Sequence, residues 1–415
     1  MINIAWLMRM YPAFQHAGFR LYFVGAIIGM LGAWTEITAQ QWLVYKLTDS
    51  AILLGLVGAT TFLPTLLFSL HAGAIIDRYD RRKMLFVTQT VMMVLSLITG
   101  YLVWTDAIQY WHVLVLAFIA GIAMTLDIPA RQAFIPELID DKSLPNALNL
   151  SSLTINMARF VGPMIAALLI DSYGIAMCFF FNGLCFLPTL YIYHTIRPIN
   201  KKKRIGPKQE MLQEIKDGLL YIRYRPYIRT PLLLVAIVSM FLMNFAVITP
   251  IYVGEILHGE VTDFGLLSSA IGGGSFIGAI LMSSFVRRVP TMRDIYIFTV
   301  LTHLLFASSI LANSLLFGLV VFSSVGFVIV LFLISCNNML QTRVNDAYRG
   351  RVMSVYSLVF FGVTPFGSTI SGWLLDSLGP DNGILACSVI SAVLVIFALM
   401  TFGRTRENDI LDAKG

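Results

Sequence analysis

Charged side chains are scarce in this sequence. Only 13% of its 415 residues are Asp, Glu, Lys or Arg, whereas a soluble domain carries about 25%. Hydrophobic residues make up 57%. Apolar runs of about 20 residues recur along the chain, each long enough to cross the ~30 Å hydrocarbon core of a bilayer as a helix. No polar face alternates with these runs, so the composition excludes a large water-soluble core.

Residues that carry chemistry are also few. The four cysteines all fall in predicted spans and form no Cys-x-x-Cys pair, which indicates packing residues rather than a disulfide framework or a zinc site. Gly272-x-Gly274 lies in the middle of a span with no strand before it, so it is not a dinucleotide-binding loop. No phosphate-binding loop and no compact catalytic cluster are present. The sequence therefore predicts no metal, no cofactor and no enzyme activity.

We predict an all-α integral membrane protein with twelve transmembrane helices. Their approximate ranges are 18–43, 51–75, 84–104, 110–128, 147–170, 174–196, 231–253, 264–286, 292–312, 315–337, 352–375 and 382–403.

The distribution of the net charge of +6 predicts the orientation. Of the 29 Lys and Arg residues, only Lys46 falls in a predicted outer loop and only Arg159 falls well within a span rather than at its inner end. Positive residues collect on the cytoplasmic side, because they resist translocation and favour the anionic leaflet. The pattern predicts that both termini are cytoplasmic. It also accounts for the net positive charge, so no nucleic-acid partner is needed to explain that charge.

The polar residues 198–229 divide the chain. They predict a cytoplasmic linker between an N-terminal six-helix half, 1–197, and a C-terminal six-helix half with a short cytoplasmic tail, 230–415. Within the linker, Lys201 to Arg204 suits either anionic lipid head groups or a solvated segment that sets the topology. Residues 208–224 have the pattern of a short amphipathic helix on the membrane.

The two halves resemble each other. Residues 162–174 match residues 367–379 at an offset of 205, and the same offset places Gly73 on Gly278. Two halves in the same orientation form a parallel repeat, which is used by transporters that rock about a central site.

The charged turn at residues 73–83 resembles the signature between helices 2 and 3 of the major facilitator superfamily. It reads Gly73-x-x-x-Asp77-Arg78-x-x-Arg81-Arg82-Lys83, with Asp80 where the family has a second glycine. The stretches 127–138, 144–147 and 156–163 resemble the branch that contains the enterobactin exporters and related drug or siderophore effluxers. The resemblance covers nearly the whole chain and implies the major facilitator fold.

The resemblance implies that this turn is a latch that holds the cytoplasmic side closed in one state. Contacts that form in only one state bias an equilibrium between two packings. Asp77 is expected to pair with Arg78 and Arg131, and Asp127 belongs to the same network or to the gate. The alternative is a cluster that merely follows the positive-inside rule, which does not explain an aspartate at a helix end. The predicted latch set is Gly73, Asp77, Arg78, Arg81, Arg82, Asp127 and Arg131.

Two ionisable residues fall well within spans, where charge is costly and is a functional hypothesis by default. In the family's fold the helices of Glu36 and Arg159 border the central cavity. Mutual pairing would lower the cost of both, so a static structural ion pair is one interpretation. The other makes Glu36 the group that contacts substrate or carries a proton. Further polar candidates are Gln40, Asn244 and Asn337, for which ordinary packing is the alternative.

Gly162-Pro163 resembles the antiporter motif of the family. Ala166 and Ala167 stand where the family has two glycines, which weakens the inference of proton antiport. Small residues at these positions also permit close helix approach.

Together these features predict a secondary active transporter that works by alternating access. We expect a monomer in a bacterial inner (plasma) membrane that exports an amphipathic small molecule, siderophore or drug-like, coupled to protons and surrounded by membrane lipids. The alternatives are an importer or facilitator of a small metabolite and, from another class, a non-transporting sensor or an enzyme.

Overall fold

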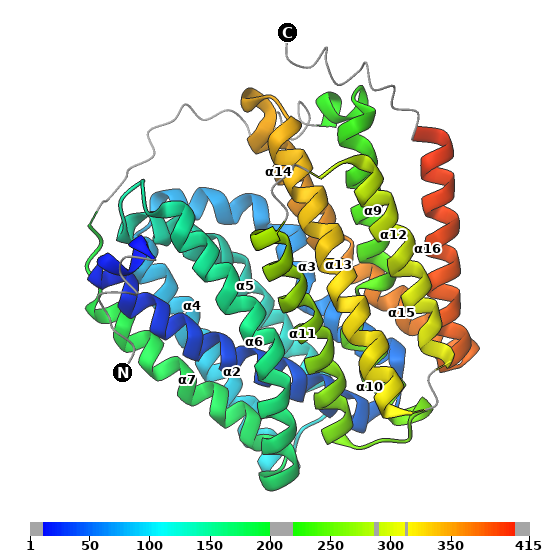
Figure 1. The fold of residues 1–415 in the computed structure, drawn as a ribbon. Helices are drawn as coiled ribbons and strands as arrows, with labels where there is room; N and C mark the ends of the chain where they lie inside the picture. The colour runs from blue at the N-terminus through cyan, green and yellow to red at the C-terminus, as the bar shows by residue number, and fades with distance from the viewer. Residues whose placement is uncertain (1–10, 200–218, 286–289, 312–313, 403–415) are drawn as a thin grey trace. The chain divides into compact units, whose positions relative to one another are not determined.

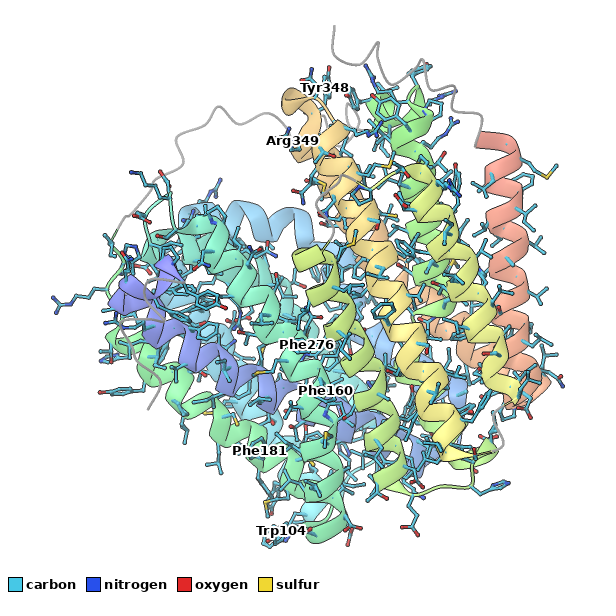
Figure 2. The ribbon with its side chains drawn as sticks, viewed as in Figure 1. Trp104, Phe160, Phe181, Phe276, Tyr348 and Arg349 are labelled. Carbon is cyan, nitrogen blue, oxygen red and sulfur yellow. The ribbon has the colours of Figure 1, made fainter. Side chains whose placement is uncertain are left out.

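The computed structural model describes residues 11–199, 219–285, 290–311 and 314–402. All regular structure in these ranges is helical (Figure 1). Within these described ranges, twelve stretches are long and apolar enough to cross a membrane, which confirms the predicted span number and fold class. Many large apolar side chains are exposed, among them Leu184, Ile396 and Phe397. Trp104 at the end of α4 is another (Figure 2). Such a surface is stable when lipid is the solvent.

The N-terminal helices begin after a short 3-10 turn. In order they are η1 (Pro12–Gln15), α2 (Ala17–Thr48), α3 (Ala51–Arg78), α4 (Arg81–Trp104), α5 (Tyr110–Leu138), α6 (Leu144–Tyr173) and α7 (Ala176–Thr195).

The C-terminal helices supply the other six spans, three of which are made from more than one helix. In order they are α9 (Pro226–Leu242), α10 (Phe245–Ile251), the π-helical η2 (Tyr252–Ile256), α11 (Val261–Phe285), α12 (Met292–Ser308), η3 (Ser309–Leu311), α13 (Leu315–Arg343), α14 (Asp346–Gly362), α15 (Thr364–Leu378) and α16 (Pro380–Phe402).

The chain forms two compact units. Unit 1 contains Met1–Leu47 and Leu63–Gly206, and unit 2 contains Thr48–Phe62 and Pro207–Gly415. The first part of α3 therefore belongs to unit 2, and the remainder of the same helix belongs to unit 1. The end of the helices that carries the turn at residues 78–83 is called the basic end.

Helix α5 continues ten residues beyond the end expected from its apolar run, from 128 to Leu138. The extension carries charges that find partners within unit 1. Arg131 pairs with Asp127 on α5 itself, and Arg81 at the start of α4 pairs with Glu137. Pairing lowers the cost of placing charge on a helix that packs against its neighbours, so the helix outlasts its hydrophobic segment.

The seventh span is broken at Met243–Asn244, between α9 and α10. A break frees backbone groups that must find partners in a membrane. Asn244 supplies a partner for one of these groups, because its Nδ2 donates to the carbonyl oxygen of Met240 at 2.6 Å. The same nitrogen also donates to the Ser371 hydroxyl on α15 at 2.9 Å. The sequence did not predict this break, since hydrophobicity continues across it.

The predicted span 352–375 is also two helices, α14 and α15. Pro365 lies in the first turn of α15 and has no N–H to continue the ladder of α14. Proline is well suited to this first-turn position, where the N–H would have no helical partner.

Glycine allows two long helices of unit 2 to touch along their backbones. A Cβ built on Gly274 of α11 would overlap the carbonyl oxygen of Ser323 on α13, and one built on Gly326 would overlap that of Ile271. The two helices run side by side in Figure 1. Small residues at this crossing permit the close approach of the two helices.

The start of α3 is held by a carboxylate from α15, again within unit 2. Asp376 accepts hydrogen bonds from the Ser50 hydroxyl at 2.7 Å and from the backbone N–H groups of Ala51 and Ile52 at 2.7 and 3.0 Å. These N–H groups have no acceptor within the helix, and the positive end of the helix dipole favours a negative charge there. Asp376 therefore acts as an N-cap supplied by a different helix.

Replacing Asp376 with alanine should destabilise unit 2 by about 0.5–2 kcal/mol, the range for loss of an N-cap. Thermal unfolding of the purified protein in detergent would measure it. Asp171→Ala is the matched control, because Asp171 is the repeat-related counterpart, is exposed, and has no hydrogen bond to any residue that the structure describes. Equal melting temperatures for the two variants would contradict the capping role.

Candidate functional site in the N-terminal helices

The centre of α2 crosses α6 at a glycine. A Cβ on Gly162 would come within 2.5 Å of the Trp34 Cβ, so only glycine permits this approach. The Thr35 hydroxyl lies 3.3 Å from the Gly162 carbonyl oxygen across the same crossing. Gly162, which belongs to the segment that resembles the antiporter motif, thus fixes Trp34 against α6.

Arg159 lies one turn before Gly162 on α6 and reaches the same side of α2. Its guanidinium carbon is 5.0 Å from the centroid of the Trp34 ring. Its Nε is buried and has no hydrogen-bond partner among the described residues, and the side chain forms no ion pair there. A cation–π contact gives about 2 kcal/mol when desolvated, whereas a lone arginine at the centre of a membrane helix costs about 2.5–3.5 kcal/mol or more. The protein therefore leaves the charge of Arg159 only partly compensated.

Glu36 lies on the opposite side of α2 and joins two other helices. One carboxylate oxygen contacts the Ser96 hydroxyl on α4 and the Asn182 Nδ2 on α7. We call Glu36, Ser96 and Asn182 the Glu36 cluster. Both partners of Glu36 are neutral, and among the described residues no Lys, Arg or His pairs with it.

The Glu36 cluster has hydrogen bonds available in either protonation state. Ser96 has a single hydroxyl proton and two acceptors in reach, Glu36 and the Phe179 carbonyl oxygen at 2.9 Å. When Glu36 is ionised, Ser96 donates to the carboxylate. When Glu36 is protonated, the carboxyl can donate to Ser96 Oγ while Ser96 donates to Phe179. The cluster can therefore hold a proton or release it without leaving the Ser96 hydroxyl unpaired.

The pairing of Glu36 with Arg159 that the sequence suggested is not found. Trp34 and Glu36 are two residues apart, which places them about 200° apart around α2. Residues at that spacing do not share a face. Since Arg159 lies on the Trp34 side, it meets the indole ring rather than the carboxylate.

A second polar cluster joins α4 and α5 nearer the basic end. The Asp127 side chain is 5% exposed and accepts hydrogen bonds from Thr88 at 2.9 Å, Gln89 at 2.8 Å and Arg131 at 2.7 Å. We call Asp127, Arg131, Thr88 and Gln89 the Asp127 cluster. The structure places Asp127 and Arg131, both predicted as latch residues, in contact with each other inside unit 1.

The turn between α3 and α4 is built from caps and one ion pair. Asp80 accepts a hydrogen bond from the Lys83 backbone N–H at 3.2 Å and caps α4, which explains an aspartate where the family has glycine. Arg81 contacts Glu137 at 2.6 Å, and Arg82 donates to the carbonyl oxygen of Ile196, the C-cap residue of α7, at 2.9 Å. These contacts tie α4 to the ends of α5 and α7.

The Asp77 contacts central to the predicted latch fall outside the described side chains, as do those of Gly73. Arg78 is exposed in the last turn of α3. The latch therefore stays a prediction. The lipid-binding segment expected at Lys201 to Arg204 also lies outside the described residues, as does most of the helix expected at 208–224.

At the basic end, the carboxyl group of Asp140 in the loop before α6 has a shifted pKa. The hydroxyl and backbone N–H of Ser143 both donate to Asp140 and lower the pKa of that carboxyl below its ordinary value, with a smaller contribution from His16 at 3.5 Å.

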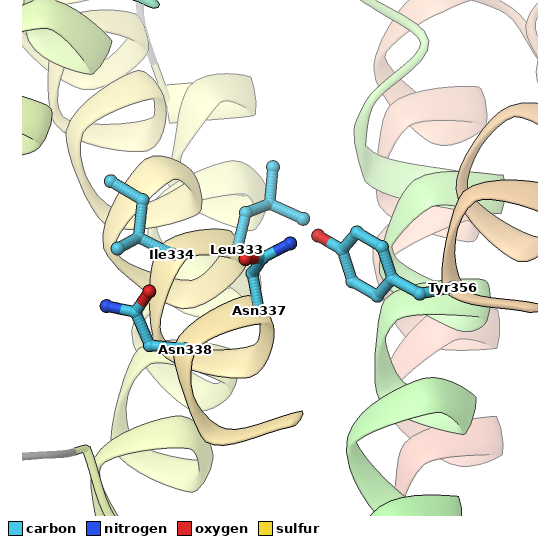
Figure 3. Close-up of a pocket in the computed structure, with 5 residues that line it drawn as sticks. All are labelled: Leu333, Ile334, Asn337, Asn338 and Tyr356. Atoms are coloured by element: carbon cyan, nitrogen blue, oxygen red, sulfur yellow. The ribbon is translucent and has the colours of Figure 1, made fainter. Parts of the chain in front are cut away.

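The remaining amide candidates lie in different surroundings. Gln40 is half-buried one turn after Glu36 and forms no hydrogen bond with the residues that the structure describes. Asn244 is buried at the break in the seventh span, and both its N–H donors are used. Asn337 lines a hollow of about 220 Å³ in unit 2, where Tyr356 points its hydroxyl toward the amide from the facing helix (Figure 3).

Sequence reasoning missed the neutral partners in both clusters. Ser96 and Asn182 hold Glu36, while Thr88 and Gln89 hold Asp127. A search for every amide and hydroxyl within a predicted span would have included all four. It would not have selected them, because each partner lies at least 38 residues along the chain from the carboxylate it contacts.

A family model described as "Transmembrane secretion effector" matches residues 9–414. The chain belongs to this family of major facilitator superfamily transporters. It is a multi-pass membrane protein with twelve spans that transports a small molecule, and it is not an enzyme. The resemblance drawn from residues 73–83 and 127–163 is confirmed.

Relatives in this transporter family match over almost the whole chain. The staphyloferrin A transporter of Staphylococcus aureus is 24% identical, over 91% of this chain and 95% of the relative. The multidrug efflux pump Tap of Mycolicibacterium fortuitum is 27% identical, over 94% and 97%. The macrolide efflux protein A of Streptococcus pyogenes is 23% identical, over 92% and 94%.

Solved structures of transporters share the fold at low sequence identity. The nucleoside transporter NupG superposes with a TM-score of 0.74 at 11% identity, covering 94% of this chain and all of NupG. A bacterial homologue of the lysosomal transporter Spinster gives 0.71 at 12% identity, covering 96% of each chain.

Proposed function

We propose that this transporter exports an amphipathic small molecule from a bacterial cell in exchange for protons, by alternating access. The observation that carries the proposal is Glu36, a carboxyl group within a span whose partners, Ser96 and Asn182, are neutral. A group that carries protons must be stable with and without its proton, and the hydrogen bonds of the Glu36 cluster allow both states.

The direction and the kind of substrate are inferred from the relatives. Two of them have names that contain "efflux", and another is named for a siderophore. This supports export of a siderophore or a drug-like compound over import of a metabolite.

The charge distribution supports the remaining parts of the proposal. Lys and Arg gather at one end of the spans, which favours a plasma membrane location with both termini in the cytoplasm. A hollow of about 290 Å³ at that end combines Arg82, Lys83 and His194 with Phe86 and Val87, which suits a membrane lipid. The proposed form is a monomer, with the charged turn at residues 73–83 as the cytoplasmic latch.

Proton movement in inside-out vesicles tests the proposal. A dye reports an imposed pH gradient while siderophores and lipophilic drugs are added in turn. We expect at least one compound to collapse the gradient with wild type, and the rate to fall at least tenfold with Glu36→Gln, which keeps the shape of the side chain but cannot release a proton.

Glu260→Gln is the matched control, because Glu260 is an exposed carboxylate at the far end of the spans. It should behave as wild type. Equal rates for wild type and Glu36→Gln would exclude Glu36 from the proton path. A gradient that no compound disturbs with wild type would contradict proton coupling.

A further inference from the structure

Arg159 lies near the middle of its span, and the residues that the structure describes provide no anion for it. Arg131 has Asp127 at 2.7 Å, and Arg81 has Glu137 at 2.6 Å. Arg159 has only the face of Trp34, and its Nε is buried without a hydrogen bond. A guanidinium with five donors and no acceptor is an incomplete site.

The surroundings of Arg159 restrict what completes it. The side chain remains partly exposed, so its terminal nitrogens can reach a ligand. Trp34 is held in place by the crossing at Gly162 and presents an aromatic surface beside the charge. A guanidinium beside an aromatic ring matches a ligand with a carboxylate on an aromatic or apolar body.

We propose that Arg159 and Trp34 form an anion subsite, and that the transported molecule is an amphipathic organic acid whose carboxylate pairs with Arg159. The inference rests on the proposed transport function and narrows its substrate class. It also separates two tasks, because the proton site at Glu36 and the anion subsite lie on opposite faces of α2.

Equilibrium binding to the purified full-length protein tests the subsite without any gradient. The probes are 2-naphthoate and 2-naphthamide, which share a ring system and differ in charge. Wild type should bind naphthoate at least tenfold more tightly than naphthamide. Arg159→Gln should bring the ratio of the two Kd values close to one. Arg159→Lys keeps the charge without the bidentate fork and should retain a reduced preference for the acid.

Lys46→Gln is the matched control. Lys46 lies 5.1 Å from the centroid of the Trp42 ring on the same helix, so its replacement removes a cation–π contact of the same kind elsewhere on α2. The preference for the acid should be unchanged. Trp34→Leu should weaken both probes and leave their ratio intact. If Arg159→Gln does not fold, Arg159→Lys still tests the preference for the acid, and Trp34→Leu still tests the contribution of the ring to the binding of both probes.

Three results would overturn the subsite. They are no saturable binding of naphthoate by wild type, a preference that persists in Arg159→Gln, and the same loss of preference in Lys46→Gln. None depends on proton movement. A preference for the acid that requires Arg159, found together with gradients that no compound disturbs, would retain the subsite and reject proton-coupled export.

Discussion

Asp127→Ala is expected to destabilise unit 1 by roughly 3–5 kcal/mol, the cost of removing one partner from a buried ion pair. The substitution leaves Arg131, Thr88 and Gln89 without the acceptor that all three share. At about 2–4 °C per kcal/mol for a unit of this size, the melting temperature should fall by roughly 6–20 °C. Thermal unfolding in detergent would measure the difference.

Two further variants make the Asp127 result specific. Asp127→Asn keeps an oxygen acceptor but loses the charge, so it should fall between wild type and the alanine variant. Asp381→Ala removes an exposed carboxylate from the first turn of α16 and should shift the melting temperature little. An Asp127→Ala protein that melts with wild type would show that the cluster contributes little to stability.

Gly274→Leu is expected to prevent the folding of unit 2 in most molecules. The Cβ of any side chain at this position would overlap the Ser323 carbonyl oxygen, a backbone atom that can move only if α11 and α13 separate. Overpacking costs about 1–3 kcal/mol where side chains can adjust, and here the obstacle is backbone. Size-exclusion chromatography of the detergent-solubilised protein should show loss of the monodisperse peak.

The glycine series distinguishes overlap from helix propensity. Gly274→Ala adds only the Cβ and should be milder than leucine but still destabilising. Gly350→Leu is the control, since nothing lies within 4 Å of a Cβ built there. A monodisperse Gly274→Leu protein with the stability of Gly350→Leu would contradict a tight α11–α13 contact.

Hydrophobicity was sufficient to predict the number of spans but not their ends or breaks. The apolar run of α5 stops near 128, and the helix continues to Leu138 because Arg131 and Glu137 find partners in the fold. The break at Asn244 lies within an unbroken apolar run. The side-chain hydrogen bond by which Asn244 satisfies the Met240 carbonyl at the break has no signal in hydropathy.

The candidate site was predictable as a set of residues but not as a set of contacts. Charge within a span selected both Glu36 and Arg159 as candidates. The assumption that opposite charges pair then failed, because the two-residue spacing of Trp34 and Glu36 turns the carboxylate away from α6. The partners Ser96 and Asn182 come from helices that only the tertiary fold brings to α2.

The place where helix α3 can bend follows from three features, which are its cap, its division between the two units and its proline. Its first turn is clamped by Asp376, and its first part belongs to unit 2 while the remainder belongs to unit 1. Pro64 lies two residues beyond Phe62, where unit 2 gives way to unit 1 within the helix, and lacks the N–H that would bond to the preceding turn. Helix α3 therefore resists bending least near Pro64, close to the residue where the helix passes from unit 2 to unit 1. A bend in α3 would therefore concentrate at Pro64 rather than spread evenly along the helix.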